Sequence, residues 1–181
     1  KENGVNRKTQ FSTQAVYFGE TLISLNTLMP NQFVNYLLKN HGLEFLQDWD
    51  YNRREVSFGS SRFDFLLEKN DEIMVLEVKS VTLVENNIAK FPDAITRRGR
   101  RHVHHLGKMA EEGLRTMVLF VVQRPDVKCF HPQWNRDPDF GYALFDAWKK
   151  GLQVRVIRME MTRDTLKYLG EIPYKLKPET S

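Results

Sequence analysis

The chain has 181 residues, of which 41% are hydrophobic, and a modest net charge of +4. This hydrophobic content, with 12 Phe, 6 Tyr and 3 Trp, excludes an intrinsically disordered protein. The length fits one domain of about 150 residues with some additional chain, and no apolar run approaches the roughly 18 residues that span a bilayer. With one cysteine and no signal-peptide pattern, we expect a cytoplasmic protein that does not bind the membrane.

Turn residues and alternating hydrophobicity predict a β-hairpin first and then a short helix. The hairpin strands are expected at Thr13–Phe18 and Thr21–Leu25, and the helix at 30–39. The remaining elements follow as strands at Arg53–Phe58, Arg62–Leu67 and Ile73–Val81, a helix at Asp93–Glu112, a strand at Thr116–Val122, a helix at Asp139–Lys150 and a strand at Gln153–Met159. The sequence therefore predicts an α/β fold with a mixed β-sheet flanked by helices, and a loosely structured tail after Pro173.

Two carboxylates are predicted to face each other on adjacent strands. A turn centred between Asn70 and Asp71 places Asp64 opposite Glu77 and puts Lys79 on the same face. The surrounding positions on both faces are apolar, so the two acids are poorly solvated and need a neutralising partner. Ordinary diagonal ion pairs with neighbouring basic residues are the alternative.

The spacing of these residues favours a metal site over ordinary ion pairs. An Asp, a gap of twelve residues and then Glu-X-Lys form the pattern of PD-(D/E)XK nucleases, and here the Asp and the Glu-X-Lys lie on successive strands between two helices. Asp64 and Glu77 are therefore predicted to bind Mg²⁺ or Mn²⁺, with the Val78 carbonyl as a further candidate ligand. Lys79 is predicted to orient the attacking water or to stabilise charge on the phosphate.

Glu55 is a candidate third acid of this site. A two-residue turn at Gly59-Ser60 places Glu55 opposite Asp64. A solvated charge next to Arg53 and Arg54 is an equally good interpretation.

A basic segment in the long helix predicts contacts with phosphate groups. No acidic residue occurs between Ile95 and Ala110, whereas solvated helix faces usually mix charges of both signs. Arginine side chains match phosphate oxygens and can hold a nucleic-acid backbone without reading its sequence. The candidate nucleic-acid-binding residues are Arg62, Arg97, Arg98, Arg100, Arg101 and Lys108, with His102, His104 and His105 beside them.

Several segments resemble the sugar fermentation stimulation protein A family. They include Arg54-Glu55-Val56, the run 61–67, Glu77-Val78-Lys79-Ser80-Val81, Phe91-Pro92-Asp93-Ala94 and the Arg/His helix at 96–106. The resemblance implies a bacterial or archaeal cytosolic DNA-binding protein, linked by the family's name to regulation of sugar metabolism. It also implies a restriction-endonuclease-like, PD-(D/E)XK core and assigns the metal and catalytic roles to Asp64, Glu77 and Lys79.

The resemblance further implies how the chain is divided. Family members carry an N-terminal OB-like barrel, so residues 1–29 are expected to be a linker and β-hairpin from a mostly absent barrel. Residues 30–176 would form the nuclease-like domain and residues 177–181 a tail. This barrel and DNA are the expected partners, and a homo-oligomer is compatible with the sequence.

Two classes of function follow from these features. The first is a Mg²⁺-dependent nuclease acting on DNA, which the intact motif favours. The second is a non-catalytic DNA-binding regulator of sugar metabolism that retains a nuclease scaffold. A sugar-binding regulator has no support in the sequence beyond the family's name.

Overall fold

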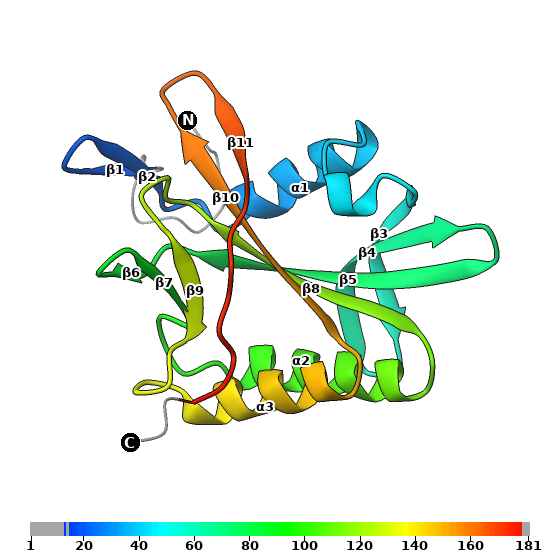
Figure 1. The fold of residues 1–181 in the computed structure, drawn as a ribbon. Coiled ribbons are helices and arrows are strands. Elements are labelled where there is room, and N and C mark those ends of the chain that lie inside the picture. Colours follow the sequence, from blue (N-terminus) through cyan, green and yellow to red (C-terminus); the bar gives the residue numbers. More distant parts are fainter. Residues whose placement is uncertain (1–12, 14, 179–181) are drawn as a thin grey trace, which may run out of the picture.

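The fold is a large mixed β-sheet with one helix on one face and two helices on the other (Figure 1). The computed structural model describes residue 13 and residues 15–178. The elements in chain order are β1 (Ala15–Phe18), β2 (Thr21–Ser24), α1 (Met29–Lys39), η1 (Glu44–Leu46), β3 (Asp50–Phe58), β4 (Ser61–Lys69), β5 (Glu72–Val81), β6 (Val84–Glu85), β7 (Ile88–Phe91), α2 (Arg97–Glu111), β8 (Arg115–Val122), β9 (Cys129–Pro132), α3 (Pro138–Lys149), β10 (Gln153–Met161) and β11 (Leu166–Glu171).

The main sheet has the strand order β1-β2-β10-β8-β5-β4-β3, and β11 pairs with β10. Strands β5, β8 and β10 run parallel to one another, whereas β3, β4 and β5 form an antiparallel meander. The predicted hairpin is present as β1 and β2, which join the sheet through the pair Met161↔Leu22. The division at residues 29/30 and 176/177 remains a prediction, because much of both terminal segments lies outside the described residues.

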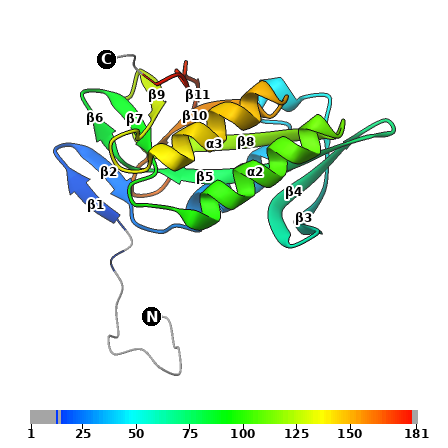
Figure 2. The same cartoon turned by 90° about the horizontal axis from the view of Figure 1, so that it is seen from below.

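Two hydrophobic layers hold the helices against the sheet. Helix α1 packs on one face against residues that include Phe65, Leu76 and Met117. Helices α2 and α3 cover the opposite face, where Phe63 and Val75 belong to the core (Figure 2). Gly107 allows the two helices to approach closely, because a Cβ atom there would lie 2.7 Å from the Cβ atom of Ala147.

The long helix begins four residues later than predicted, at Arg97 instead of Asp93. The Thr96 side chain ends the preceding loop by accepting a hydrogen bond from the Gly99 N–H at 3.0 Å. Asp137 caps α3 through the Phe140 N–H and also accepts from the Thr96 N–H at 2.8 Å. This one carboxylate therefore ties together the N-terminal ends of both helices.

Short strands form a second sheet that the sequence patterns did not predict. It has the order β6-β7-β9, and β7 and β9 run parallel. Strand β11 was also not predicted, and it occupies part of the segment before the expected loose tail. In the part of the chain that the structure describes, none of the helices is long and apolar enough to cross a membrane.

Candidate metal and nucleic-acid site

Asp64 and Glu77 lie where strands β4 and β5 separate. The two strands pair from Lys69↔Glu72 to Phe65↔Leu76, which confirms the predicted register. Asp64 and Glu77 are the next residues along this register. Instead of a further backbone pair, the Val78 N–H donates to the Asp64 side chain, with 2.7 Å between N and Oδ2. The Asp64 carboxylate thus accepts the first β5 backbone N–H bond to β4 beyond the last backbone pair of the two strands.

Glu77 is buried, and its two carboxylate oxygens have different surroundings. Oε1 lies 2.6 Å from Lys79 Nζ and 2.7 Å from His102 Nδ1. Oε2 is buried and has no hydrogen-bond donor among the described residues. A buried acceptor without a donor is costly. Glu77 therefore has one oxygen held by the protein and one available to a ligand.

Burial and neighbouring charges move the pKa values of the two acids in opposite directions. Burial raises the pKa of Asp64, and the nearby negative charge of Glu77 raises it further. Burial also disfavours the charge of Glu77, but the hydrogen bond from His102 and the charge of Lys79 outweigh it and lower the pKa of Glu77. The surroundings thus favour the ionised form of Glu77 and disfavour that of Asp64.

Asp64 receives a second hydrogen bond from the opposite helix layer. Asn31, in the first turn of α1, donates from Nδ2 to Asp64 Oδ1 at 2.8 Å. Both carboxylate oxygens of Asp64 are therefore oriented by the protein, one from α1 and one from β5. Sequence reasoning did not assign Asn31 to the site.

His102 is a second residue that sequence reasoning missed. We placed it beside the basic residues predicted to bind phosphate, but its side chain is buried and contacts Glu77. The Phe63 ring also packs against it in a T-shaped arrangement, with 5.4 Å between ring centroids. Helical spacing could have indicated this, because His102 belongs to the stripe formed by Gly99, Val103 and Leu106.

The face of Phe63 is a correction to the predicted alternation. A strict period of two would place Phe63 and Phe65 on one side of the sheet, but Phe63 packs toward α2 and Phe65 toward α1. The change occurs at Asp64, whose register partner Glu55 has a left-handed backbone with φ +54°. This irregularity breaks the period of two on which the prediction depended.

The structure places Glu55 at the surface. The register of β3 and β4 is as predicted, with Arg54↔Phe65 and Val56↔Phe63 on either side of it. Its carboxylate is exposed and forms an ion pair with the exposed Arg62 at 3.8 Å. Glu55 and Arg62 therefore partner each other, and the candidate acids that the structure brings together are Asp64 and Glu77.

The predicted phosphate-binding residues of α2 fall into two groups. Arg100 is paired with Asp139 in the first turn of α3, and Lys108 lies 3.7 Å from Glu112. The side chains of the other three are exposed and form no hydrogen bond or ion pair with residue 13 or residues 15–178; they are Arg97, Arg98 and Arg101.

Arg98 and Arg101 lie on the side of α2 that faces β4. Each is one helical turn before a histidine, His102 and His105, that contacts the Phe63 ring. The same side of α2 carries the His102–Glu77 contact. These two arginines are therefore the free cations on α2 that are placed toward the paired carboxylates.

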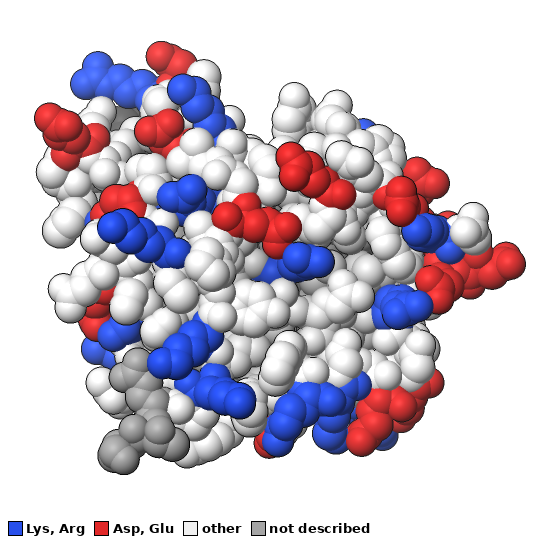
Figure 3. Space-filling model, viewed as in Figure 1, with Lys and Arg blue, Asp and Glu red and all other residues white. Residues whose placement is uncertain are grey.

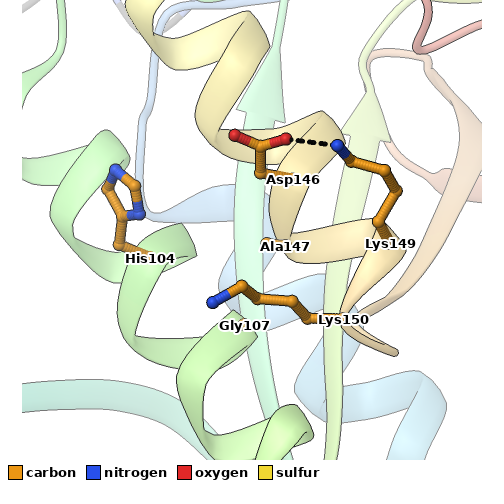
Figure 4. A pocket seen from close by; sticks show the side chains of 6 residues that line it. All are labelled: His104, Gly107, Asp146, Ala147, Lys149 and Lys150. Atoms are coloured by element: carbon orange, nitrogen blue, oxygen red, sulfur yellow. Dashed lines mark ion pairs between the residues drawn. The ribbon is translucent and has the colours of Figure 1, made fainter.

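A pocket of about 330 Å³ lies between α2 and α3 (Figure 4). Unlike the surface with Arg98 and Arg101, it has no unpaired Lys or Arg side chain among its lining residues. His104 lines it from α2, but its two lysines are already paired with acids. Lys149 lies 2.8 Å from Asp146, and Lys150 lies 2.8 Å from Glu111. On the face that carries β10 and β11, basic and acidic side chains are likewise interspersed (Figure 3).

The carboxylate oxygens of Asp64 and Glu77 suit a divalent cation that is held by few protein ligands. Among the described residues, no three His, Cys, Asp or Glu side chains are grouped as a metal cluster. Mg²⁺ commonly binds through one or two carboxylates, with water and substrate phosphate completing its shell. Asp64 and the free Oε2 of Glu77 fit that mode. We therefore consider Asp64 and Glu77 the candidate ligands.

Comparisons with known proteins agree on one family. A family model described as "Sugar fermentation stimulation protein RE domain" matches residues 28–165. A "Sugar fermentation stimulation protein homolog" of Natranaerobius thermophilus is 38% identical over 189 residues, which cover 99% of this chain and 76% of that protein. The homolog of Clostridium botulinum strain Langeland is 43% identical over 155 residues, covering 85% of this chain and 67% of that protein.

A solved structure is similar over nearly the whole chain. It is Pyrococcus furiosus SfsA, described in complex with Ca²⁺, with 26% sequence identity and a TM-score of 0.87. The similarity covers 95% of this chain and 75% of the other. This similarity confirms the predicted fold class, a mixed α/β sheet with a restriction-endonuclease-like core preceded by a β-hairpin.

Proposed function

Because the chain belongs to the sugar fermentation stimulation protein family, we propose that it is a DNA-binding protein with a phosphodiester-hydrolysing site that depends on Mg²⁺ or Mn²⁺. One observation carries the proposal: Glu77 Oε2 is buried without a donor next to Asp64 and Lys79. Ca²⁺ in the described complex of the Pyrococcus furiosus protein supports a divalent cation, since Ca²⁺ also takes oxygen ligands. The chemistry such an ion supplies is charge neutralisation at the phosphate and activation of water.

The protein's own residues bind the cation, orient its ligands and contact the phosphate groups. Asp64 and Glu77 hold the cation site, and their hydrogen bonds with Asn31, Val78 and His102 fix their orientation. Lys79 Nζ is held beside Glu77, where its charge can stabilise negative charge that develops on the phosphate. Arg98 and Arg101 bind the DNA backbone and position it.

Cleavage of single- and double-stranded DNA tests the proposal. We expect the protein to cut DNA in the presence of Mg²⁺ or Mn²⁺, and we expect cleavage to stop when EDTA removes the ion. Salt-dependent DNA binding by a folded protein that does not cut in either ion would contradict the catalytic part. That result would favour the alternative, a non-catalytic DNA-binding regulator on a nuclease scaffold.

The arginines of α2 give a second expected result. Changing both Arg98 and Arg101 to Gln should weaken DNA binding similarly for all sequences and reduce the slope of log K against log salt by about two, roughly one per lost phosphate contact. Filter binding or fluorescence anisotropy over a salt series measures this slope.

The matched control is Arg115→Gln. Arg115 is also exposed, but it pairs with Glu72 at the far end of β5 and β8. We expect this variant to keep the wild-type slope. An unchanged slope in the double variant would remove Arg98 and Arg101 from the DNA-binding surface.

A further inference from the structure

Asn31 has two polar atoms with different roles at the candidate site. Its Nδ2 donates to Asp64 Oδ1 at 2.8 Å. Its Oδ1 is buried and has no hydrogen-bond donor among the described residues. The amide therefore fixes a candidate metal ligand with one atom and leaves an unpaired acceptor with the other.

The backbone around Asn31 makes this contact rigid. Asn31 follows Pro30 in the first turn of α1, and the buried Phe33 and Val34 anchor that turn to the sheet. Val78 holds the other oxygen of Asp64 from β5. Asp64 thus cannot turn away from the site without breaking a bond on each side, which is how residues behind a metal ligand usually orient it.

The charge of the site favours one divalent cation. Asp64 and Glu77 bring two negative charges, and Lys79 brings one positive charge within 2.6 Å of Glu77. One divalent ion then leaves a small positive excess that suits a phosphodiester, whereas a second would add positive charge with no carboxylate to balance it. An acid at position 31 would supply that carboxylate, but the amide oxygen is neutral.

Resting on the proposed function, we propose that Asn31 is a positioning residue for Asp64 and that its neutral side chain limits the site to a single divalent cation. The cation would be held by Asp64 and Glu77. This assigns a role to α1, from which sequence reasoning took no site residue.

Counting Mn²⁺ ions in the intact chain tests the proposal without any measurement of activity. Electron paramagnetic resonance of unbound Mn²⁺ gives the number bound and their affinity. We expect one Mn²⁺ per wild-type chain. Asn31→Ala should still bind one ion, about 10- to 100-fold more weakly. Asn31→Asp, which keeps the size of the side chain, should bind two.

Asn35→Ala is the matched control. Asn35 lies one turn further along α1 and also has a buried Oδ1 without a donor, but it has no bond to Asp64. Its Mn²⁺ affinity should stay within about twofold of wild type, in contrast to the loss expected behind a metal ligand. Circular dichroism shows whether each variant is folded, and if Asn31→Ala is not, the ion count of Asn31→Asp decides.

The outcomes separate this inference from the proposed function. Two ions bound to the wild type, unchanged affinity in folded Asn31→Ala, or a single ion in Asn31→Asp would overturn the role of Asn31 and leave the metal site intact. A wild-type chain that binds no Mn²⁺ would overturn the proposed function, and this inference with it.

Discussion

Replacing Glu77 by Gln is expected to lower metal-dependent cleavage by about three orders of magnitude, because a lost metal ligand removes several kcal/mol of transition-state stabilisation. The substitution keeps the shape of the side chain. Its remaining oxygen can still accept from Lys79 and contact His102, as Glu77 Oε1 does at 2.6 and 2.7 Å. Only the buried Oε2 is exchanged, for an amide nitrogen that cannot bind a cation.

Initial cleavage rates and calorimetric titration with Mg²⁺ measure the two expected losses. Glu72→Gln is the matched control, because Glu72 begins the same strand but is exposed and paired with Arg115. That variant should cut and bind metal like the wild type. If Glu77→Gln cut DNA at the wild-type rate, Glu77 would not be a metal ligand and the observed cleavage would come from elsewhere.

The register that leads to Asp64 and Glu77 could be predicted from one local rule. The turn at Asn70-Asp71 sets the register, so counting from the turn gives the strand pairs as far as Phe65↔Leu76, directly before Asp64 and Glu77. The same counting failed at Phe63, where the irregular backbone at Glu55 and Asp64 shifts the alternation. The face on which a strand residue lies can thus be predicted from sequence only until an irregular backbone interrupts the alternation.

The residues that orient the two acids were harder to predict because they come from distant parts of the chain. Asn31 is 33 residues before Asp64, and His102 is 25 residues after Glu77. His102 could have been placed in the core from its helical spacing, although its partner could not. Nothing local in α1 indicates that Asn31 meets β4, because that contact depends on how the helix crosses the sheet.

The small sheet shows a different limit of sequence reasoning. Strands β6 and β7 have two and four residues, too few for a hydrophobic period to stand out. Their partner β9 comes only after α2 and β8, so no short turn indicates the pairing. Strand β7 ends at Phe91, and the Thr96 cap then sets the start of α2 at Arg97.

Lys79→Ala is expected to separate cleavage from binding. Lys79 Nζ lies 2.6 Å from Glu77 Oε1, and the side chain is only 12% exposed, so its charge acts in a poorly solvated site. Losing a charge that stabilises the transition state should reduce cleavage by about 100- to 1,000-fold. The divalent cation should bind more tightly than in the wild type, because a neighbouring positive charge is gone and Glu77 Oε1 no longer has an ion-pair partner that competes with the ion.

Opposite changes in rate and metal affinity are the decisive feature of this variant. A merely structural lysine would weaken both through loss of the folded site, whereas a catalytic one loses rate while metal binding improves. Lys69→Ala serves as the control, since Lys69 lies on β4 and pairs with the exposed Asp48. If folded Lys79→Ala still cut DNA at the wild-type rate, another residue would have to stabilise the negative charge that develops on the phosphate. Among the described residues, the free arginines of α2 would then be the first to examine.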